Sequence, residues 1–147
     1  STLIEVLIAV LIMGIGLLGV AALQTTALRN SQSAMERSQA VIQTYAIIDA
    51  MRANRDAAIS GGYDTGGWEC TAPTGGSLAV NDRTVWLDAL KRTMGRVGDD
   101  TTCGNVDCDD GLCTVAVRWD DSRAVESDAD GVAAGQTQRQ VETRVLL

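Results

Sequence analysis

The stretch Ser1–Gln24, STLIEVLIAVLIMGIGLLGVAALQ, decides the fold of this chain. From Val6 to Leu23 it holds eighteen residues without a charged or polar side chain. A helix of that length extends about 27 Å, close to the roughly 30 Å hydrocarbon thickness of a bilayer. The sequence therefore predicts an N-terminal helix whose first half, residues 1–24, spans a membrane.

The residues ahead of this apolar run differ from the start of a secretory signal peptide. Such a peptide carries basic residues before its apolar segment, whereas Ser1 to Ile4 contain none and the chain does not begin with Met. We therefore expect a processed chain from which a leader has been removed.

The helix is expected to continue well past the apolar run. No proline precedes Pro73, and Gly61-Gly62 is the first helix-ending cluster, so residues from about 2 to 59 are predicted as one uninterrupted helix. Beyond the run, apolar residues recur mostly three, four or seven apart, which predicts an amphipathic half, residues 25–60, whose stripe packs on a head domain. The stripe consists of Leu28, Met35, Ile42, Tyr45, Ile48, Met51 and Ile59.

Three glycines, Gly14, Gly16 and Gly19, are the weak points of the predicted span. Each costs about 1 kcal/mol relative to alanine in a soluble helix, but in a membrane glycine also permits close helix approach. The sequence leaves open whether they reflect ordinary membrane-helix composition or specific helix packing and local melting.

The remainder, residues 61–147, is an acidic head. Residues 1–60 hold four acids and four arginines, so the whole net charge of −7 lies in the head. Because an acidic surface repels phosphate, binding to nucleic acid or anionic lipid is not expected.

Local patterns in the head predict one helix and a small antiparallel sheet, which gives an α+β fold. Asn81 or Asp82 can cap a helix that runs to about Met94 and covers the sheet with one face. Candidate strands are residues 96–103, 112–120 and 138–147. The predicted inward residues are Trp86, Leu87, Leu90 and Met94 on the helix, and Val141, Thr143, Val145 and Leu147 on the last strand.

Four cysteines, Cys70, Cys103, Cys108 and Cys113, indicate an oxidising compartment and two disulfides. Three pairings are formally open. Cys108 and Cys113 would close a short turn, which favours that bond together with Cys70–Cys103. A zinc site is the alternative, but the spacing lacks a Cys-x2-Cys pair and the chain has no histidine.

The acidic segment 120–136 is predicted to be a loop or a long hairpin turn. Its residues Glu126, Asp128, Asp130 and Gly131 imitate the start of a calcium loop, but Thr137 stands where a bidentate Glu is needed. We therefore predict no metal and no cofactor. Without histidine or a facing carboxylate pair, a membrane-anchored enzyme is a weak alternative.

Glu5 is the most informative residue, because a carboxylate at the start of an apolar run is costly unless it finds a partner. From spacing alone it either pairs with another group or snorkels into water. Its surroundings, Thr2-Leu3-Ile4-Glu5-Val6-Leu7-Ile8-Ala9, resemble the start of mature type IV pilins and type II secretion pseudopilins, which follows the prepilin peptidase cleavage site.

That resemblance implies a type IV pilin fold and a role for Glu5 and Ser1 in assembly. In this family, the glutamate at the position of Glu5 attracts the free amino terminus of a neighbouring subunit. A carboxylate and an α-amino cation relieve each other's desolvation cost in a low-dielectric environment. The family also implies an inner-membrane, single-pass subunit with a periplasmic head before assembly.

Further stretches are similar to the minor pilin family PilV, the type IV pilus modification proteins. That family implies priming of assembly, a place at the extracellular pilus tip, and contacts with other minor pilins, the major pilin and a large tip adhesin. A minor type II secretion pseudopilin is the alternative function. The stretches are Gly16-Leu17-Leu18-Gly19, Leu28-Arg29-Asn30, residues 49–55, Ala57-Ala58, Gly62-Tyr63 and Val117-Arg118-Trp119-Asp120.

Two positions depart from the pattern of major pilins. Ser1 replaces their usual phenylalanine, so N-methylation there is not assured, and Ala22 stands where they commonly have a kinking proline. Both departures fit a minor subunit better than the main building block.

Overall fold

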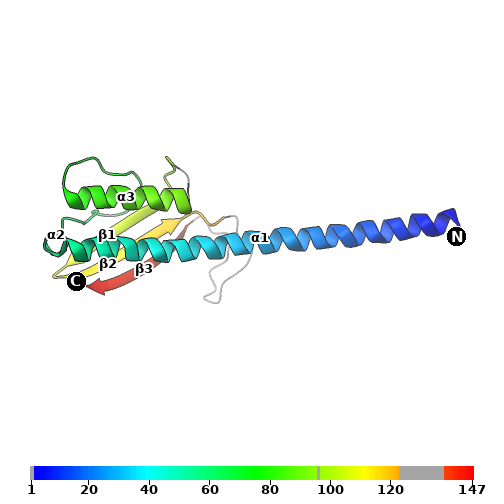
Figure 1. Ribbon diagram of the computed structural model, residues 1–147, viewed down its shortest axis with the longest axis horizontal. Helices are drawn as coiled ribbons and strands as arrows, with labels where there is room; N and C mark the ends of the chain where they lie inside the picture. Colours follow the sequence, from blue (N-terminus) through cyan, green and yellow to red (C-terminus); the bar gives the residue numbers. More distant parts are fainter. Residues whose placement is uncertain (1, 96, 123–137) are drawn as a thin grey trace.

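The computed structural model describes residues 2–95, 97–122 and 138–147 of the chain. The long first helix lies along a three-stranded antiparallel sheet at one end and extends alone at the other (Figure 1). The predicted α+β arrangement of a long N-terminal helix on a small antiparallel sheet is confirmed. The elements are α1 (Leu3–Ala53), α2 (Arg55–Ile59), α3 (Leu78–Thr93), β1 (Cys103–Asp109), β2 (Leu112–Trp119) and β3 (Arg139–Leu146).

Helix α1 has 51 residues and ends at Ala53, earlier than the predicted residue 59. Asn54 leaves the helical region (φ −122°, ψ 50°), although its backbone N–H still reaches the carbonyl oxygens of Ala50 and Met51. The short helix α2 follows at once. The prediction of one uninterrupted helix is therefore wrong, because the helix breaks once, at Asn54. The side chain of Asn54 forms a hydrogen bond with Tyr63 of the head.

The sheet has the order β1-β2-β3, with β2 in the centre. A two-residue turn, Asp110-Gly111, joins β1 to β2, and its positive φ angles (47° and 82°) match the right-handed twist of a hairpin. Strand β3 pairs with β2 along its whole length, from Leu112 opposite Leu146 to Trp119 opposite Arg139. In β3, side chains alternate between exposed and partly buried, as the sequence predicted.

Strand β1 lies later in the chain than the predicted segment 96–103: residues 97–102 are not part of a strand, and Cys103 is its first residue. Residue 96 lies outside the described residues. Asp99 explains the shift, because its Oδ1 accepts hydrogen bonds from the backbone N–H groups of Thr101 (3.2 Å) and Thr102 (2.8 Å). Lys91 lies 3.5 Å from the same oxygen. Backbone groups that a carboxylate has taken up are not available to a neighbouring strand.

The hydrophobic core lies between α1, α3 and one face of the sheet. Val115, Val117 and Trp119 alternate along β2 and are fully buried in it. From α3, all four predicted inward residues are at most 3% exposed, so the predicted face is correct.

Helix α3 packs mainly beside α1 and reaches the sheet at β1, so the expectation that it covers the sheet is only partly right. Trp86 makes the central contact. Its indole Nε1 donates a 3.0 Å hydrogen bond to the carbonyl of Gln43 in α1. Its ring lies so close to Gly104 in β1 that an added Cβ would be 2.3 Å from a ring carbon, which only glycine avoids.

Helix α3 begins earlier than predicted, and the predicted N-cap residues are wrong. Ser77 is the N-cap and its Oγ accepts a 3.2 Å hydrogen bond from the backbone N–H of Val80. Asn81 and Asp82, the predicted caps, lie inside the helix. Serine is as good a capping residue as either, and it frees Asp82 for a tertiary contact.

That contact is with Tyr63, whose side chain is fully buried. Its hydroxyl donates a 2.5 Å hydrogen bond to Asp82 Oδ2 and accepts one of 3.3 Å from Asn54 Nδ2. The end of α1, the connection after α2 and the first turns of α3 are thereby joined at one oxygen. Burial, followed by the hydrogen bond to Asp82, raises the pKa of Tyr63 from 10.0 to about 12.

Replacing Tyr63 by Phe should lower the free energy of unfolding by about 1–2 kcal/mol, because it removes a buried hydrogen bond to a carboxylate. Tyr45→Phe is the matched control: that side chain is 53% exposed, and its loss of a hydroxyl should cost less than about 0.5 kcal/mol. Urea unfolding of the full chain in detergent micelles measures both. Equal effects would contradict the assigned role of Tyr63.

The raised pKa of Tyr63 predicts that the fold loses stability in alkaline solution. The folded chain holds the Tyr63 proton more tightly than the unfolded chain. The contribution of Tyr63 to the free energy of unfolding is therefore complete below pH 10 and is lost as the pH rises through about 12. The urea midpoint should fall over that range in the wild type and in Tyr45→Phe. A fall of the same size in Tyr63→Phe would assign the effect to other groups.

Candidate functional site

The first half of α1 presents apolar side chains on all sides. Every large apolar residue from Leu3 to Leu23 has more than half of its surface exposed. By length and composition this is one helix able to cross a membrane. Because its most apolar window is entirely unburied, it is not a core helix of the head, and its surface requires lipid or other protein to cover it.

Glu5 lies at the tip of this helix. One of its carboxylate oxygens, Oε2, accepts a 2.8 Å hydrogen bond from the backbone N–H of Thr2, the N-cap residue. Glu5 thus satisfies a free donor at the end of its own helix. A carboxylate has about four acceptor sites, so this cap leaves it able to accept from a second partner. Ser1, the other predicted assembly residue, lies outside the described residues.

The three glycines of the span lie in open space, since an added Cβ at Gly14, Gly16 or Gly19 would meet nothing within 4 Å. Residues two apart on a helix are turned by about 200°, so Gly14 and Gly16 face nearly opposite sides. Gly16 and Gly19 differ by only about 60° around the helix axis, so these two share one side. The chain does not gather the three glycines into one stripe.

The second half of α1 meets the head with a face other than the predicted one. Of the predicted stripe, Ile48 and Met51 are buried and Ile59, in α2, is partly buried. The other members point into solvent, and we call them the outer stripe. The outer stripe consists of Leu28 (71% exposed), Met35 (63%), Ile42 (55%) and Tyr45 (53%).

Small residues explain why the head packs on the face of α1 that carries Ala40 and Thr44. Ala40 and Thr44 are completely buried, and the hydroxyl of Thr44 is satisfied by the carbonyl of Ala40 at 2.8 Å. Side chains this small let the sheet approach the helix backbone closely. Ala40, Thr44, Ile47 and Met51 recur at intervals of three and four, so their spacing could have predicted this buried face. Alanine and threonine are only weakly apolar, and the pattern was therefore less visible than the stripe of larger residues.

A buried ion pair fixes α1 to the edge of the sheet. Arg139 Nη1, at the start of β3, lies 2.9 Å from Asp121 Oδ2, and the two side chains are 8% and 2% exposed. Ser33 Oγ, from α1, donates a 2.8 Å hydrogen bond to the same carboxylate oxygen. Breaking such a pair leaves a buried charge uncompensated, so this cluster holds α1 in one orientation on the head.

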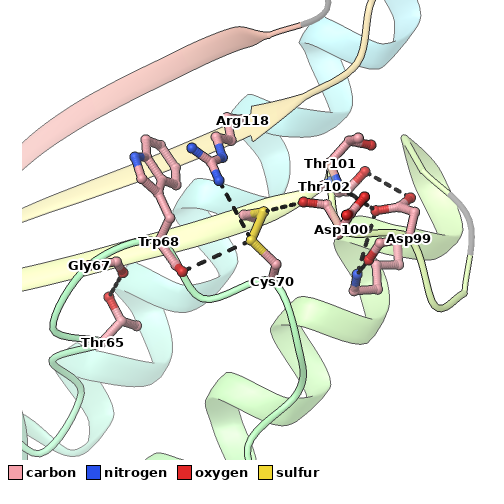
Figure 2. Close-up of a disulfide and its surroundings, with 11 residues drawn as sticks. Thr65, Gly67, Trp68, Cys70, Asp99, Asp100, Thr101, Thr102 and Arg118 are labelled. Atoms are coloured by element: carbon pink, nitrogen blue, oxygen red, sulfur yellow. Dashed lines mark hydrogen bonds and ion pairs between the residues drawn. A yellow bond between two sulfur atoms is a disulfide. The ribbon is translucent and has the colours of Figure 1, made fainter.

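Both favoured disulfides are present. Cys70–Cys103 joins the segment before α3 to the start of β1, and Cys108–Cys113 joins directly opposed residues of β1 and β2. Figure 2 shows the guanidinium of Arg118 between the first disulfide and the ring of Trp68. It lies 4.7 Å from the ring centre, within the range of a cation–π contact.

All four cysteines form disulfides in the structure, so none of them is a free thiolate. Among residues 2–95, 97–122 and 138–147 no group of three or more Cys, Asp or Glu side chains could hold a metal ion. The weak calcium pattern, residues 126–137, lies outside the described residues.

Comparison with known proteins gave no relative. No protein-family model matches the chain, and neither a curated protein nor a solved structure matches it. The exposed surface of α1 and the groups at its tip are therefore the basis for inferring a function.

The two disulfides should differ in their effect on stability. Cys70 and Cys103 are 33 residues apart and Cys108 and Cys113 only 5. Closing the longer loop removes more entropy from the unfolded chain, so the double serine variants should lose about 4 and about 2 kcal/mol, respectively. Urea unfolding in detergent under non-reducing conditions tests this order. A larger loss for the hairpin disulfide would reverse it.

Proposed function

We propose that this protein is a minor subunit of a type IV pilus, held in the inner membrane by α1 and later incorporated through α1 into the filament tip. The observation that carries the proposal is the exposed apolar surface of α1. It surrounds the first half of the helix and continues along the outer stripe of the second half.

This surface suits a subunit that changes its surroundings. Lipid covers the first half in the membrane, at a length of about 27 Å for residues 6–23. When such a helix leaves the bilayer, the same side chains must be buried against other helices, because exposed patches this large are unstable in water. A bundle of parallel helices from several subunits supplies that cover.

The outer stripe extends the argument beyond the membrane. Soluble heads rarely leave large apolar residues in a row on a helix unless a partner covers them. Leu28, Met35 and Ile42 are spaced by seven residues, the repeat with which helices pack side by side. A mere anchor needs only the first half of α1, whereas an assembly helix needs both.

Glu5 would supply the register of assembly. In a helix bundle its carboxylate would lie in an apolar environment, where an unpaired charge is costly. The α-amino group of a neighbouring subunit is the cation best placed to pair with it, since parallel helices place their N-termini at the same end of the bundle. The capping bond to Thr2 orients the carboxylate at the helix tip.

The proposal includes the partners implied by the resemblance of Thr2 to Ala9 to pilins. Prepilin peptidase would release the mature N-terminus, with the head on the periplasmic side. Other minor pilins and the major pilin would pack against α1, and a large tip adhesin would contact the complex outside the cell. Through its place in the tip, the protein would act in adhesion and twitching motility.

Two substitutions at Glu5 separate pairing from capping. Glu5→Ala removes both the charge and the cap, whereas Glu5→Gln removes the charge and keeps an acceptor that suits a capping box. If the charge pair sets assembly, both should reduce incorporation into sheared surface filaments about a hundredfold, the effect of an uncompensated buried charge. Immunoblotting of sheared filaments measures it.

Glu142→Gln, in the exposed face of β3, controls for the loss of one negative charge from the chain. It should assemble like the wild type. If Glu5→Gln assembles like the wild type and Glu5→Ala does not, Glu5 acts only as a helix cap and its charge is not needed for assembly. Normal assembly of both would remove the carboxylate from the mechanism.

A further inference from the structure

The two sulfurs of the Cys70–Cys103 disulfide have different surroundings (Figure 2). Cys70, in the connection ahead of α3, is partly exposed, whereas Cys103 at the start of β1 is completely buried. Nη2 of Arg118 lies 3.7 Å from the sulfur of Cys70. The carbonyl oxygen of Asp100 lies 3.3 Å from the sulfur of Cys103. One sulfur therefore lies beside a cation near the surface, and the other lies beside a carbonyl oxygen in a buried position.

The positive charge beside Cys70 is held in place and is not neutralised by a neighbour. The guanidinium of Arg118 lies over the ring of Trp68, 4.7 Å from its centre, which is a cation–π geometry. Within the described ranges, the polar contacts of this side chain are with Cys70 and Trp68 and include no carboxylate. The nearby carboxylate of Glu69 lies 3.6 Å from Nε of Arg83. The charge of Arg118 therefore acts on the sulfur of Cys70.

These surroundings give the two cysteines different reactivity. The nucleophile in thiol chemistry is the thiolate, and the pKa of a cysteine thiol is lowered beside an arginine and raised by burial. With the bond open, Arg118 favours the thiolate of Cys70. Burial and the Asp100 carbonyl oppose the thiolate of Cys103. With the bond closed, Cys70 belongs to the partly exposed side, from which an outside group can approach.

The backbone around the two cysteines is also held by contacts other than the disulfide. Glu69 and Gly104, the immediate neighbours of Cys70 and Cys103, exchange two backbone hydrogen bonds of 2.8 and 2.9 Å. The ring of Trp86 packs against Gly104. The two sulfurs therefore stay close when the bond opens, and attack of Cys103 on Cys70 is favoured over attack by a second outside molecule.

We propose that Cys70 is the exchange cysteine of this bond, the sulfur at which an outside thiol or disulfide reacts, and that Cys103 closes the bond from inside. In closing, the Cys70 thiolate attacks one sulfur of an outside disulfide and releases the other as a thiolate. Cys103 then loses its proton to water, attacks Cys70 and releases the first outside sulfur as a thiolate. Two electrons thereby pass from the cysteine pair to the outside disulfide.

Opening begins with the reverse attack. An outside thiolate bonds to the sulfur of Cys70, and Cys103 leaves as a thiolate that water protonates. The buried position of Cys103 makes it a poor leaving group, so the bond is made more readily than it is opened. This assignment is independent of the proposed function, because it concerns only groups within the head.

Trapping the mixed disulfide in the full-length chain tests the assignment. The oxidised protein in detergent micelles is incubated with reduced glutathione, free thiols are blocked with N-ethylmaleimide, and the peptides are mapped by mass spectrometry. We expect glutathione on Cys70 and the blocking group on Cys103. Equal glutathione labelling of the two cysteines, or labelling mainly at Cys103, would overturn the proposal.

A second probe separates small thiols from protein thiols. A thioredoxin-class protein with a single active-site cysteine attacks the same bond and stays attached, since it lacks the second cysteine that would release it. Attachment of either probe to Cys70 supports the exchange site, and comparison of the two shows which kind of thiol reaches it. If neither probe attaches to the folded chain while both attach to the urea-unfolded chain, the proposal is wrong.

Alkylation of a single free thiol tests the part played by Arg118. Cys103→Ser leaves Cys70 free and Cys70→Ser leaves Cys103 free. At neutral pH, iodoacetamide should label Cys70 about tenfold faster than Cys103, the effect of one pKa unit on the thiolate fraction. Adding Arg118→Gln to Cys103→Ser should remove most of this advantage, whereas Arg118→Lys keeps a positive charge and should react faster than Arg118→Gln.

Arg144→Gln is the matched control for loss of a cation. The Arg144 side chain is 70% exposed and lies on the same face of the sheet as Arg118. Its loss should leave the alkylation rate of Cys70 unchanged. An unchanged rate in Arg118→Gln, or faster alkylation of Cys103 than of Cys70, would contradict the proposal.

Discussion

The structure depends on one imbalance: α1 carries far more apolar surface than the head can cover. The head packs on one side of the second half of the helix, mainly through small and β-branched residues. The first half has no cover within the described part of the chain, and the outer stripe stays exposed although the head lies beside it. Hydrophobic burial is the main favourable term in folding and association, so such a chain is complete only in lipid or in an assembly.

The head compensates for its small size with directional contacts. Domains of fewer than about 100 residues bury a modest share of their surface and often need covalent or polar support. Here two disulfides close the connections around β1 and β2. Buried polar groups then fix the helices: Tyr63 joins α3 to the end of α1, and Asp121 joins α1 to β3. Rigid attachment of the head is useful if α1 must present defined surfaces to its neighbours.

Glu5 links the single chain to the proposed assembly. In the chain it accepts a hydrogen bond from Thr2 and so completes the N-terminus of its own helix. That bond places a carboxylate at the tip of an apolar rod, where a neighbouring amino group can reach it. Capping and pairing are compatible, because one carboxylate can accept several hydrogen bonds.

The sequence by itself determined the long helix with its apolar first half, the α+β class, the inward face of α3 and the central and last strands. These rest on long or strictly periodic patterns, in which each residue repeats the same signal. It also favoured the disulfide pairing, since Cys108 and Cys113 flank a tight turn. Only the tertiary structure decided where β1 begins, that Ser77 caps α3, and which face of α1 meets the head. Those choices depended on individual contacts: the bonds from Asp99 to Thr101 and Thr102, the bond from Tyr63 to Asp82, and the packing at Ala40 and Thr44. No repeating pattern in the sequence indicates contacts of this kind. Close packing selects the face that fits the sheet rather than the most apolar one, and this left the outer stripe free.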